Sequence, residues 1–232
     1  MPSRTTRVGL AAALAAVLVA GCSGDGVAER ATTLRAAATV QALPSPSTSG
    51  DVSVEEALRR RASVRSFTAA QLTEPQIGQL LWAAQGVTRD WGGRTAPSAG
   101  ALYPLEVYLV TGDEVRHYLP QGHRAQVWSD SQARTELARA AGQDAAAGAP
   151  AILVITAVVA RTAAKYGSLA ERYVLLEAGH AAQNVMLQAI PLGLGGVTIG
   201  AFDRDLVAAA LALPKGERAI YLIPLGTPAS PS

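Results

Sequence analysis

PSAGALYP, residues 97–104, is the stretch of sequence that most restricts the fold and function of this chain. A proline at each end makes the backbone stiff there, and the small residues after the first proline leave it bare. The stretch lies between a polar loop, residues 89–94, and the strand-like sequence LEVYLV, residues 105–110. Such a loop can bring its N–H and C=O groups close to a flat ligand. A plain turn at the start of a strand is the alternative.

Length and composition indicate an ordinary globular protein. The 232 residues provide for one domain, with room for an appendage. Hydrophobic residues make up 49% of the chain and the formal net charge is +2. No basic block is dense enough to follow the phosphates of a polymer, which argues against a nucleic-acid-binding protein.

The N-terminus has the features of an export signal. Arg4 and Arg7 precede an apolar run, residues 8–20, that is shorter than a typical transmembrane helix. LVAGC, residues 18–22, resembles a bacterial lipobox, which predicts a signal peptide over residues 1–21 and lipidation of Cys22. The mature protein is then exported and anchored to a membrane of the cell envelope. Cys22 is the only cysteine, so an intramolecular disulfide is excluded. A signal peptidase site with an incidental cysteine is the alternative.

Residues 22–50 are rich in Ala, Ser, Thr, Gly and Pro, with few large apolar side chains. This composition is typical of a disordered tether. A chain of this length has an r.m.s. reach of about 30 Å, enough to hold a domain away from a bilayer. The sequence therefore predicts that the folded domain covers residues 51–232.

Hydrophobic periodicity predicts alternating helices and strands within residues 51–232. Ser53 with Glu56, and Thr73 with Pro75, mark two helix starts. The mostly apolar segment 168–190 is too polar for a membrane span, because charged and amide residues recur along it. The prediction is an α+β fold with a central antiparallel or mixed sheet flanked by helices. The helices are expected from 54, from 73, over 129–146 and 168–190, and from Asp203 to 211; the strands are expected over 105–110, 151–159, 197–200 and 219–225.

Arg61, Ser63 and Arg65 form a second informative element. If the segment is extended, these three side chains point to one side and present two guanidinium groups and a hydroxyl to one ligand. Arginine forks match the geometry of a phosphate. Taken alone the pattern is weak, because a solvated basic helix end has the same composition.

Several spaced blocks together resemble the flavin-dependent nitroreductase superfamily, and most closely its SagB-type branch of thiazole/oxazole dehydrogenases. The resemblance runs from about Val54 to Gly226. The blocks are RRRASVRSF (59–67), QIGQLLWAAQGVTR (76–89), RTAPSAGALYPLEVYLV (94–110), KYG (165–167), RYVLLEAGHAAQNV (172–185) and GLGGVTIGAF (193–202).

The resemblance implies a nitroreductase-like fold with FMN bound at the interface of an intertwined homodimer. Arg61, Ser63 and Arg65 would then hold the FMN phosphate, ribityl chain and pyrimidine edge. The loop 98–101 of the other subunit would line the isoalloxazine, and the strand segment 200–201 would lie beside the ring near its N5 atom. A cation near the ring edge and a backbone donor near N5 suit hydride transfer. The implied FMN ligands are Arg61, Ser63, Arg65, Ser98, Ala99, Gly100, Ala101, Gly200 and Ala201.

Lys165 and Tyr166 are the candidate catalytic pair. In the azoline dehydrogenases that the chain resembles, a lysine and a tyrosine near this place are associated with removal of a proton while hydride goes to the flavin. A lysine partly withdrawn from water is a suitable base. The alternative is a surface lysine beside a tyrosine that only packs.

The resemblance leaves the reaction open. The leading hypothesis is an FMN-dependent oxidoreductase with hydride transfer through N5, acting on a small-molecule or peptide-derived substrate, with NAD(P)H as one candidate electron donor. Many nitroreductases have a further basic segment near the C-terminus that contacts the phosphate, which is not evident after Leu225. Two alternatives remain: a degenerate binding or scaffold lipoprotein without redox turnover, and an azoline dehydrogenase of peptide natural-product maturation.

Other motifs are weak. The glycine-rich run 193–196 follows a helix and precedes a strand, the reverse of the order in a dinucleotide-binding fold. His117, His123 and His180 lack the spacing of metal ligands, so no metal is expected, and His180 is expected in the core or at an interface. Ser98 has no evident base nearby in sequence, so hydrolase chemistry is not supported.

Overall fold

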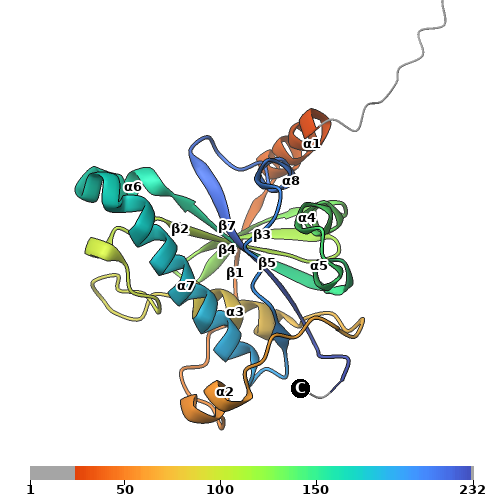
Figure 1. Ribbon diagram of the computed structural model, residues 1–232, viewed down its shortest axis with the longest axis vertical. Coiled ribbons are helices and arrows are strands. Elements are labelled where there is room, and N and C mark those ends of the chain that lie inside the picture. The colour runs from red at the N-terminus through yellow and green to blue at the C-terminus, as the bar shows by residue number, and fades with distance from the viewer. Residues whose placement is uncertain (1–23, 231–232) are drawn as a thin grey trace, which may run out of the picture.

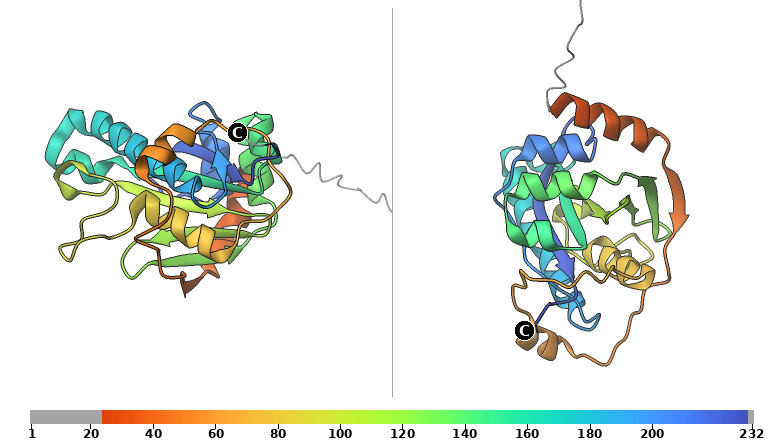
Figure 2. Two further views of the ribbon diagram at one scale, coloured as in Figure 1. Left: turned by 90° about the horizontal axis from the view of Figure 1, so that it is seen from below. Right: turned by 90° about the vertical axis from the view of Figure 1, so that its right-hand side faces the viewer.

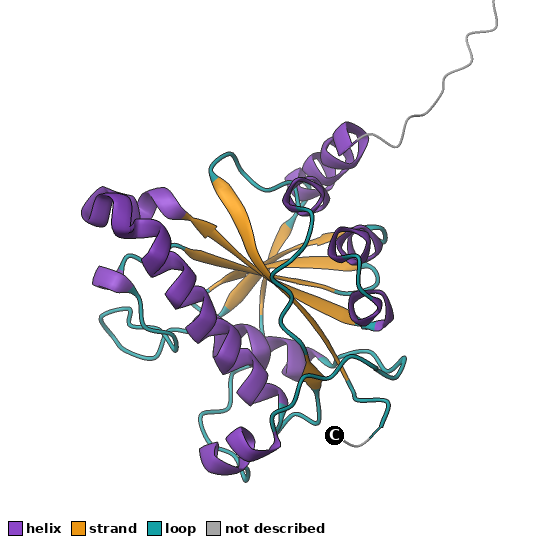
Figure 3. Cartoon of the chain, viewed as in Figure 1, coloured by secondary structure: helices purple, strands orange, loops and turns teal. Residues whose placement is uncertain are grey.

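The computed structural model describes residues 24–230, which form one central sheet with helices on both faces (Figure 1 and Figure 3). The seven strands have the spatial order β1-β4-β3-β2-β5-β7-β6, and each neighbouring pair is antiparallel. The strands are β1 (Thr39–Ala42), β2 (Leu105–Val110), β3 (Glu114–Leu119), β4 (Arg124–Ser129), β5 (Ala151–Val158), β6 (Gly195–Gly196) and β7 (Glu217–Gly226).

Eight α-helices and two short 3-10 turns within residues 24–230 complete the fold. The longest is α7, which runs diagonally across the sheet with α6 at one end and α2 at the other (Figure 1). The helices are α1 (Gly24–Ala36), α2 (Val54–Arg60), α3 (Glu74–Gln85), α4 (Ala133–Ala141), α5 (Asp144–Gly148), α6 (Val159–Tyr166), α7 (Ala170–Ala189) and α8 (Arg204–Ala210); the turns are η1 (Ala99–Ala101) and η2 (Gly167–Leu169).

Strand β5 organises the core because its side chains are buried on both faces. Leu153 and Ile155 face the cluster that also contains the buried residues of α3 and α7. Ile152 and Val154 face the opposite cluster, which contains those of α4 and α8. Since successive side chains of a strand point to opposite faces, an apolar run of this kind requires helices on both sides of the sheet.

Several predicted elements are confirmed. Ser53 accepts a hydrogen bond from the Glu56 N–H at the start of α2. Thr73 and Gln76 cap α3 reciprocally, each side chain bonding the other's backbone. The Asp203 side chain caps α8 by accepting from the N–H groups of the next turn. The strand over 105–110 and the buried strand from 151 are present with nearly the predicted bounds.

The single helix predicted over 129–146 is wrong. Residue 129 ends β4, and two short helices, α4 and α5, follow. The break lies at Gly142, which has φ +60°, a left-handed conformation that glycine adopts without strain. The strand predicted over 197–200 is wrong: the short strand β6 precedes it, and within 197–200 only Ile199 forms an isolated bridge, with Leu222.

The disordered tether predicted over residues 22–50 is not what the structure has in residues 24–50. Helix α1 packs on α8, with Ala31 fully buried. Strand β1 pairs with β4 and extends the sheet by one strand. The right-hand view of Figure 2 follows α1 and β1 along one side of the molecule. The folded domain therefore includes this segment and does not begin at residue 51.

Polar contacts to distant residues explain why this segment is ordered despite its composition. Arg30 on α1 forms ion pairs with Asp130, whose side chain is 1% exposed, and with Glu136 on α4. Farther along, the Gln79 side chain accepts from the Ser47 N–H at 2.8 Å and donates to the Ser47 carbonyl at 3.0 Å. These partners are 32 to 106 residues away in sequence, so local composition does not reveal them.

Cys22 and the predicted signal peptide lie outside the described residues. Within residues 24–230, no helix is long and apolar enough to cross a membrane.

Candidate functional site

The segment 61–65 docks beside the short strand β6. The Val64 N–H donates to the Gly196 carbonyl at 2.8 Å, and Ser63 forms a parallel bridge with Gly196. A Cβ atom at Gly195 would lie 2.5 Å from a methyl group of Val64, and one at Gly196 would lie 2.6 Å from the Pro224 carbonyl oxygen. Gly195 is therefore required by the close approach of this segment, and Gly196 by the close approach of the neighbouring strand β7.

Arg61, Ser63 and Arg65 present their side chains without an acidic partner. Ser63 and Arg65 are exposed and Arg61 is half-buried. Neither arginine forms an ion pair with a carboxylate of residues 24–230. Two guanidinium groups of one short segment, both without counter-charges, are suited to an anion such as a phosphate.

Gly200 and Ala201 continue away from this cluster along an extended segment. Thr198, Gly200 and Ala201 are exposed, whereas Ile199 between them is buried and bonded to Leu222. Four extended residues span about 13 Å, so Gly196 and Gly200 mark the ends of an elongated exposed track. The arrangement suits a long ligand with its anionic end at Arg61 and Arg65.

The loop 98–103 has an unusual backbone. Gly100, Ala101 and Tyr103 all have positive φ, at +63°, +53° and +46°. Such values cost free energy at alanine and tyrosine and cluster at functional sites. Ser98 closes the loop, because its carbonyl accepts from the Ala101 N–H and its hydroxyl from the Tyr103 N–H at 2.9 Å.

Lys165 and Tyr166 lie against this loop in the same chain. A Cβ atom at Gly100 would be 3.0 Å from the Tyr166 hydroxyl and 3.2 Å from the Lys165 ammonium nitrogen. Gly100 is thus the one small residue that lets the pair approach the loop. Tyr166 is held edge-on by Tyr173, with ring centroids 5.0 Å apart. Lys165 is exposed in the single chain, so its partial withdrawal from water would need an additional covering group.

The candidate residues form two groups at opposite ends of α7. The loop 98–101 lies with Lys165 and Tyr166 at the N-terminal end, and the segment 61–65 lies with Gly195 and Gly196 just beyond the C-terminal end. Figure 1 shows α6 and α2 at these two ends. A helix of twenty residues spans about 30 Å, so a single chain does not bring the two groups to one ligand.

Glu177 is a buried carboxyl group behind the loop that sequence analysis misses. It lies on α7, is 3% exposed, and its Oε1 atom has no hydrogen-bond partner among the described residues. Burial raises the pKa of Glu177 to about 7, although the Ser98 hydroxyl and the Arg94 guanidinium act in the opposite direction. The sequence does contain a signal for Glu177: it is a charged residue at a position that falls on the apolar face of the helix with Val174, Ala178 and Ala181.

The three histidines lie in separate surroundings. His117 pairs with Glu106 at 2.8 Å, and His123 bonds the Tyr118 hydroxyl at 2.9 Å. His180 is exposed, which excludes the core position and is compatible with an interface. Residues 24–230 contain no group of three metal-binding side chains.

Replacement of Glu177 by glutamine should change how stability depends on pH. The raised pKa stabilises the folded wild type below about pH 4.5, and this contribution is lost as pH rises to about 7 because ionisation is penalised by burial. Glutamine stays neutral throughout. We expect the wild type to lose about 3 kcal/mol relative to Glu177→Gln between pH 4.5 and 7.5, measured by guanidinium unfolding. Parallel curves would contradict the assignment. Glu29→Gln, an exposed position, is the control and should follow the wild type.

Comparison with known proteins identifies relatives over most of the chain. Residues 58–227 match the model of the nitroreductase family. The chain is 41% identical over 183 residues to the "putative nitroreductase" of Methanocaldococcus jannaschii, which covers 76% of this chain and 91% of the relative.

Solved structures agree. A "putative nitroreductase" of Ralstonia eutropha superposes with a TM-score of 0.73 at 32% identity, covering 82% of this chain and 90% of the other. A chain of the E. coli microcin synthetase complex superposes with a TM-score of 0.62 at 25% identity, covering 78% of this chain and 74% of the other. The matched region includes both ends of α7, and the chain is a member of the nitroreductase family of oxidoreductases.

Proposed function

We propose that the protein is an FMN-dependent oxidoreductase of the SagB-type branch that works as an exported, lipid-anchored homodimer. The observation that carries the cofactor assignment is the pair of arginines without acidic partners, Arg61 and Arg65, at one end of the exposed track that leads to Gly200. When bound, FMN supplies a hydride acceptor at its N5 atom.

The residues of this chain fit the parts of the cofactor. Arg61 and Arg65 provide charge and hydrogen-bond donors for the phosphate, and Ser63 provides a hydroxyl for the ribityl chain. Gly200 and Ala201 have small side chains at the far end of the track, which leaves room for a flat ring. The bare backbone of the loop 98–101 suits the opposite side of that ring, and the length of α7 supports a loop supplied by a second copy.

Exposed apolar side chains support the homodimer. Leu169, Leu175 and Leu176 are each about half exposed at the start of α7 and along it, and Leu58 on α2 is 53% exposed. Leu58 lies near the opposite end of α7 from the other three, so exposed apolar side chains occur toward both ends of this helix, which is compatible with an extended surface that a second subunit covers. An interface over α2 and α7 would bring the loop of one copy toward the arginines of the other.

Lys165 and Tyr166 are proposed to remove a proton from the substrate. They lie at the strained loop 98–103, where a second copy would also cover the exposed ammonium group. A lysine base beside a hydroxyl suits oxidation of a C–H bond next to nitrogen, as in an azoline ring. The likeness to a chain of the microcin synthetase complex, solved with a truncated precursor peptide bound, supports the peptide-derived substrate of the azoline alternative.

A second candidate function is a binding or scaffold lipoprotein that keeps the fold without redox turnover. Two points favour this function. Lys165 is exposed to solvent in the single chain. An exported chain would also have to acquire a non-covalent cofactor outside the cytoplasm. The cofactor experiment below separates the two, because a scaffold does not need Arg61 and Arg65.

Loss of Arg61 and Arg65 should weaken flavin binding. We expect the purified wild type to be yellow or to bind added FMN, and the double variant Arg61→Gln, Arg65→Gln to bind FMN at least about tenfold more weakly, since each charge-assisted contact contributes about 1.5–3 kcal/mol. Absorption spectra and FMN fluorescence titration measure this. Arg59→Gln is the matched control, because Arg59 pairs with Glu56 on the same helix end. A wild type that neither contains nor binds FMN refutes the cofactor.

Mixed dimers test whether each site is shared between copies. Gly100→Val should block the loop, because its Cβ meets Lys165 and Tyr166. Co-expression of this variant with Arg61→Gln, Arg65→Gln leaves one intact site in each mixed dimer, so flavin binding should exceed that of either variant alone. No recovery would indicate sites built within one chain.

Replacement of Lys165 should separate binding from turnover. We expect Lys165→Met to bind FMN like the wild type. If NADH or NADPH reduces the FMN of the wild type, it should also reduce that of the variant. The variant should, however, oxidise a thiazoline-containing peptide on the order of 10² to 10⁴ times more slowly. Stopped-flow spectra and peptide mass measure the two steps. Lys215→Met, an exposed position, should behave as wild type. A wild type inactive on the thiazoline excludes the azoline substrate, and an unchanged rate in Lys165→Met excludes the base.

Lipidation of Cys22 places the domain close to the membrane, because α1 begins only two residues later, at Gly24. We expect the full-length protein expressed in a bacterium to enter the membrane fraction and to incorporate labelled palmitate. Cys22→Ala should lose the label, and globomycin should block processing. A soluble, unlabelled wild type would contradict the anchor and favour a cytosolic enzyme.

A further inference from the structure

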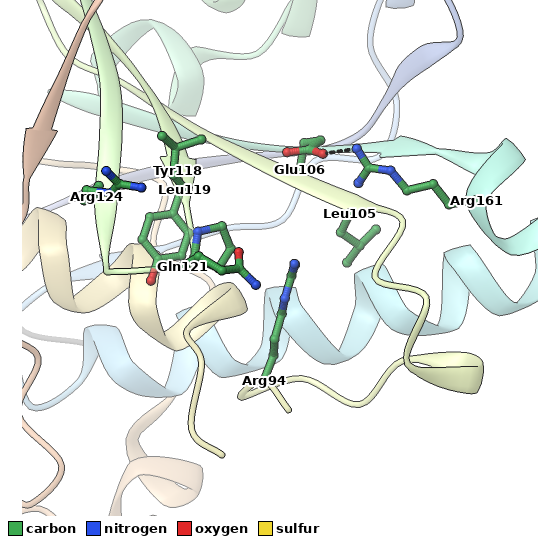
Figure 4. Close-up of a pocket in the computed structure, with 9 residues that line it drawn as sticks. Arg94, Leu105, Glu106, Tyr118, Leu119, Gln121, Arg124 and Arg161 are labelled. Carbon is green, nitrogen blue, oxygen red and sulfur yellow. Dashed lines mark ion pairs between the residues drawn. The ribbon is translucent and has the colours of Figure 1, made fainter. Parts of the chain in front are cut away.

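A cavity of about 360 Å³ lies between the loop that contains Arg94, strand β2 and the β3–β4 turn. None of the proposed flavin ligands lines it. Figure 4 shows Arg94 rising from its loop with the guanidinium end toward Leu105 and Gln121. Arg124 and Arg161 also line the cavity, and Glu106 is its one carboxylate. The lining is therefore electropositive.

Glu106 does not neutralise Arg94, because its carboxylate already has two partners. One oxygen pairs with Arg161 at 2.6 Å and the other with His117 at 2.8 Å. Although burial acts in the opposite direction, His117 and Arg161 hold the pKa of Glu106 below its usual value, so it stays ionised and engaged. Both carboxylate oxygens of Glu106 therefore already have partners within the protein.

The groups in direct contact with Arg94 are neutral, although the carboxyl groups of Glu106 and Glu177 lie nearby. Its Nη1 atom donates to the Gln85 side chain at 2.9 Å, and its guanidinium lies 4.3 Å from the centre of the Tyr103 ring. Its Nε atom is buried without a partner, and no carboxylate of residues 24–230 is within 4 Å. A guanidinium withdrawn from water without a counter-charge is unfavourable, and burial lowers the pKa of Arg94 accordingly.

The other walls are apolar. Leu105, Leu119, Pro120 and the Tyr118 side chain surround the approach to Arg94. A guanidinium fork binds a carboxylate in a bidentate manner, and the volume is near the lower end of the range for small-molecule sites. We propose that this cavity binds a small organic carboxylate, with its carboxylate on Arg94 and an apolar body against Leu105 and Pro120.

The site lies next to the strained loop. Arg94 stacks on the Tyr103 ring, and Arg161 donates to the Tyr103 carbonyl at 3.1 Å. Tyr103 is also the residue whose N–H closes the loop on Ser98. A bound carboxylate would therefore hold the cavity-side end of the loop 98–103. The inference does not rest on the proposed flavin chemistry, since binding at Arg94 needs neither cofactor nor turnover.

Calorimetric titration of the purified protein with cyclohexanecarboxylate tests the proposal. An aliphatic ring stacks poorly on a flat cofactor, so the probe discriminates between this cavity and the flavin site. We expect saturable binding, at least tenfold weaker binding of the uncharged cyclohexanecarboxamide, and at least a tenfold loss of carboxylate affinity in Arg94→Met. Arg139→Met, on the exposed side of α4, should bind like the wild type. The double variant Arg61→Gln, Arg65→Gln should also bind the carboxylate like the wild type, because neither residue lines the cavity.

Arg94→Lys guards against a variant that fails to fold. It keeps the charge and the stem but not the fork, so we expect an unchanged melting temperature with several-fold weaker binding. The proposal is overturned if the wild type shows no saturable binding up to about 10 mM, a concentration that corresponds to less than about 3 kcal/mol of affinity. Equal binding of the acid and the amide, or wild-type affinity in a folded Arg94 variant, would also overturn it.

Discussion

The burial of β5 on both faces is the constraint on which the rest of the structure depends. Leu153 and Ile155 require α3 and α7 on one side, while Ile152 and Val154 require α4 and α8 on the other. Once α7 is fixed across the sheet, its length separates the loop 98–101 from the segment 61–65. The architecture of the core thus places the candidate cofactor residues in two separate groups, and this separation is the main physical support for the proposed dimer.

The candidate chemistry gathers where local rules of stability are broken. Ala101 and Tyr103 have left-handed backbone, Glu177 is a carboxyl group inside an apolar stripe, and Arg94 forms no ion pair with a carboxylate of residues 24–230. Each feature costs free energy that the surrounding core has to offset. All four residues lie in or close to the segment 94–103 and the part of α7 behind it. The strain and the unpaired charge are better explained by ligands than by stability.

Prediction from sequence succeeded for elements with strong local signals. The caps at Ser53, Thr73 and Asp203 depend on side chains within three residues of the bonds they make, so they are readable from the sequence. The β3–β4 hairpin is not predicted, because Arg116, His117 and Gln126 interrupt its apolar pattern. Arg116 bonds Glu74 from α3 as well as Glu114 of its own strand, and His117 bonds Glu106 of β2. The prediction of a disordered tether over residues 22–50 is wrong for residues 24–50 because that segment, too, is held by partners distant in sequence.

The sequence by itself determined the family resemblance, the α+β class, the buried central strand and the residue types available for a phosphate and a flat ring. These properties depend on composition, periodicity and short motifs, which are local. Only the tertiary structure decided that α1 and β1 belong to the domain, that Gly100 admits Lys165 and Tyr166, and that Glu177 and Arg94 lie behind the same loop. Burial and charge pairing depend on residues up to a hundred positions away, and folding alone brings them together.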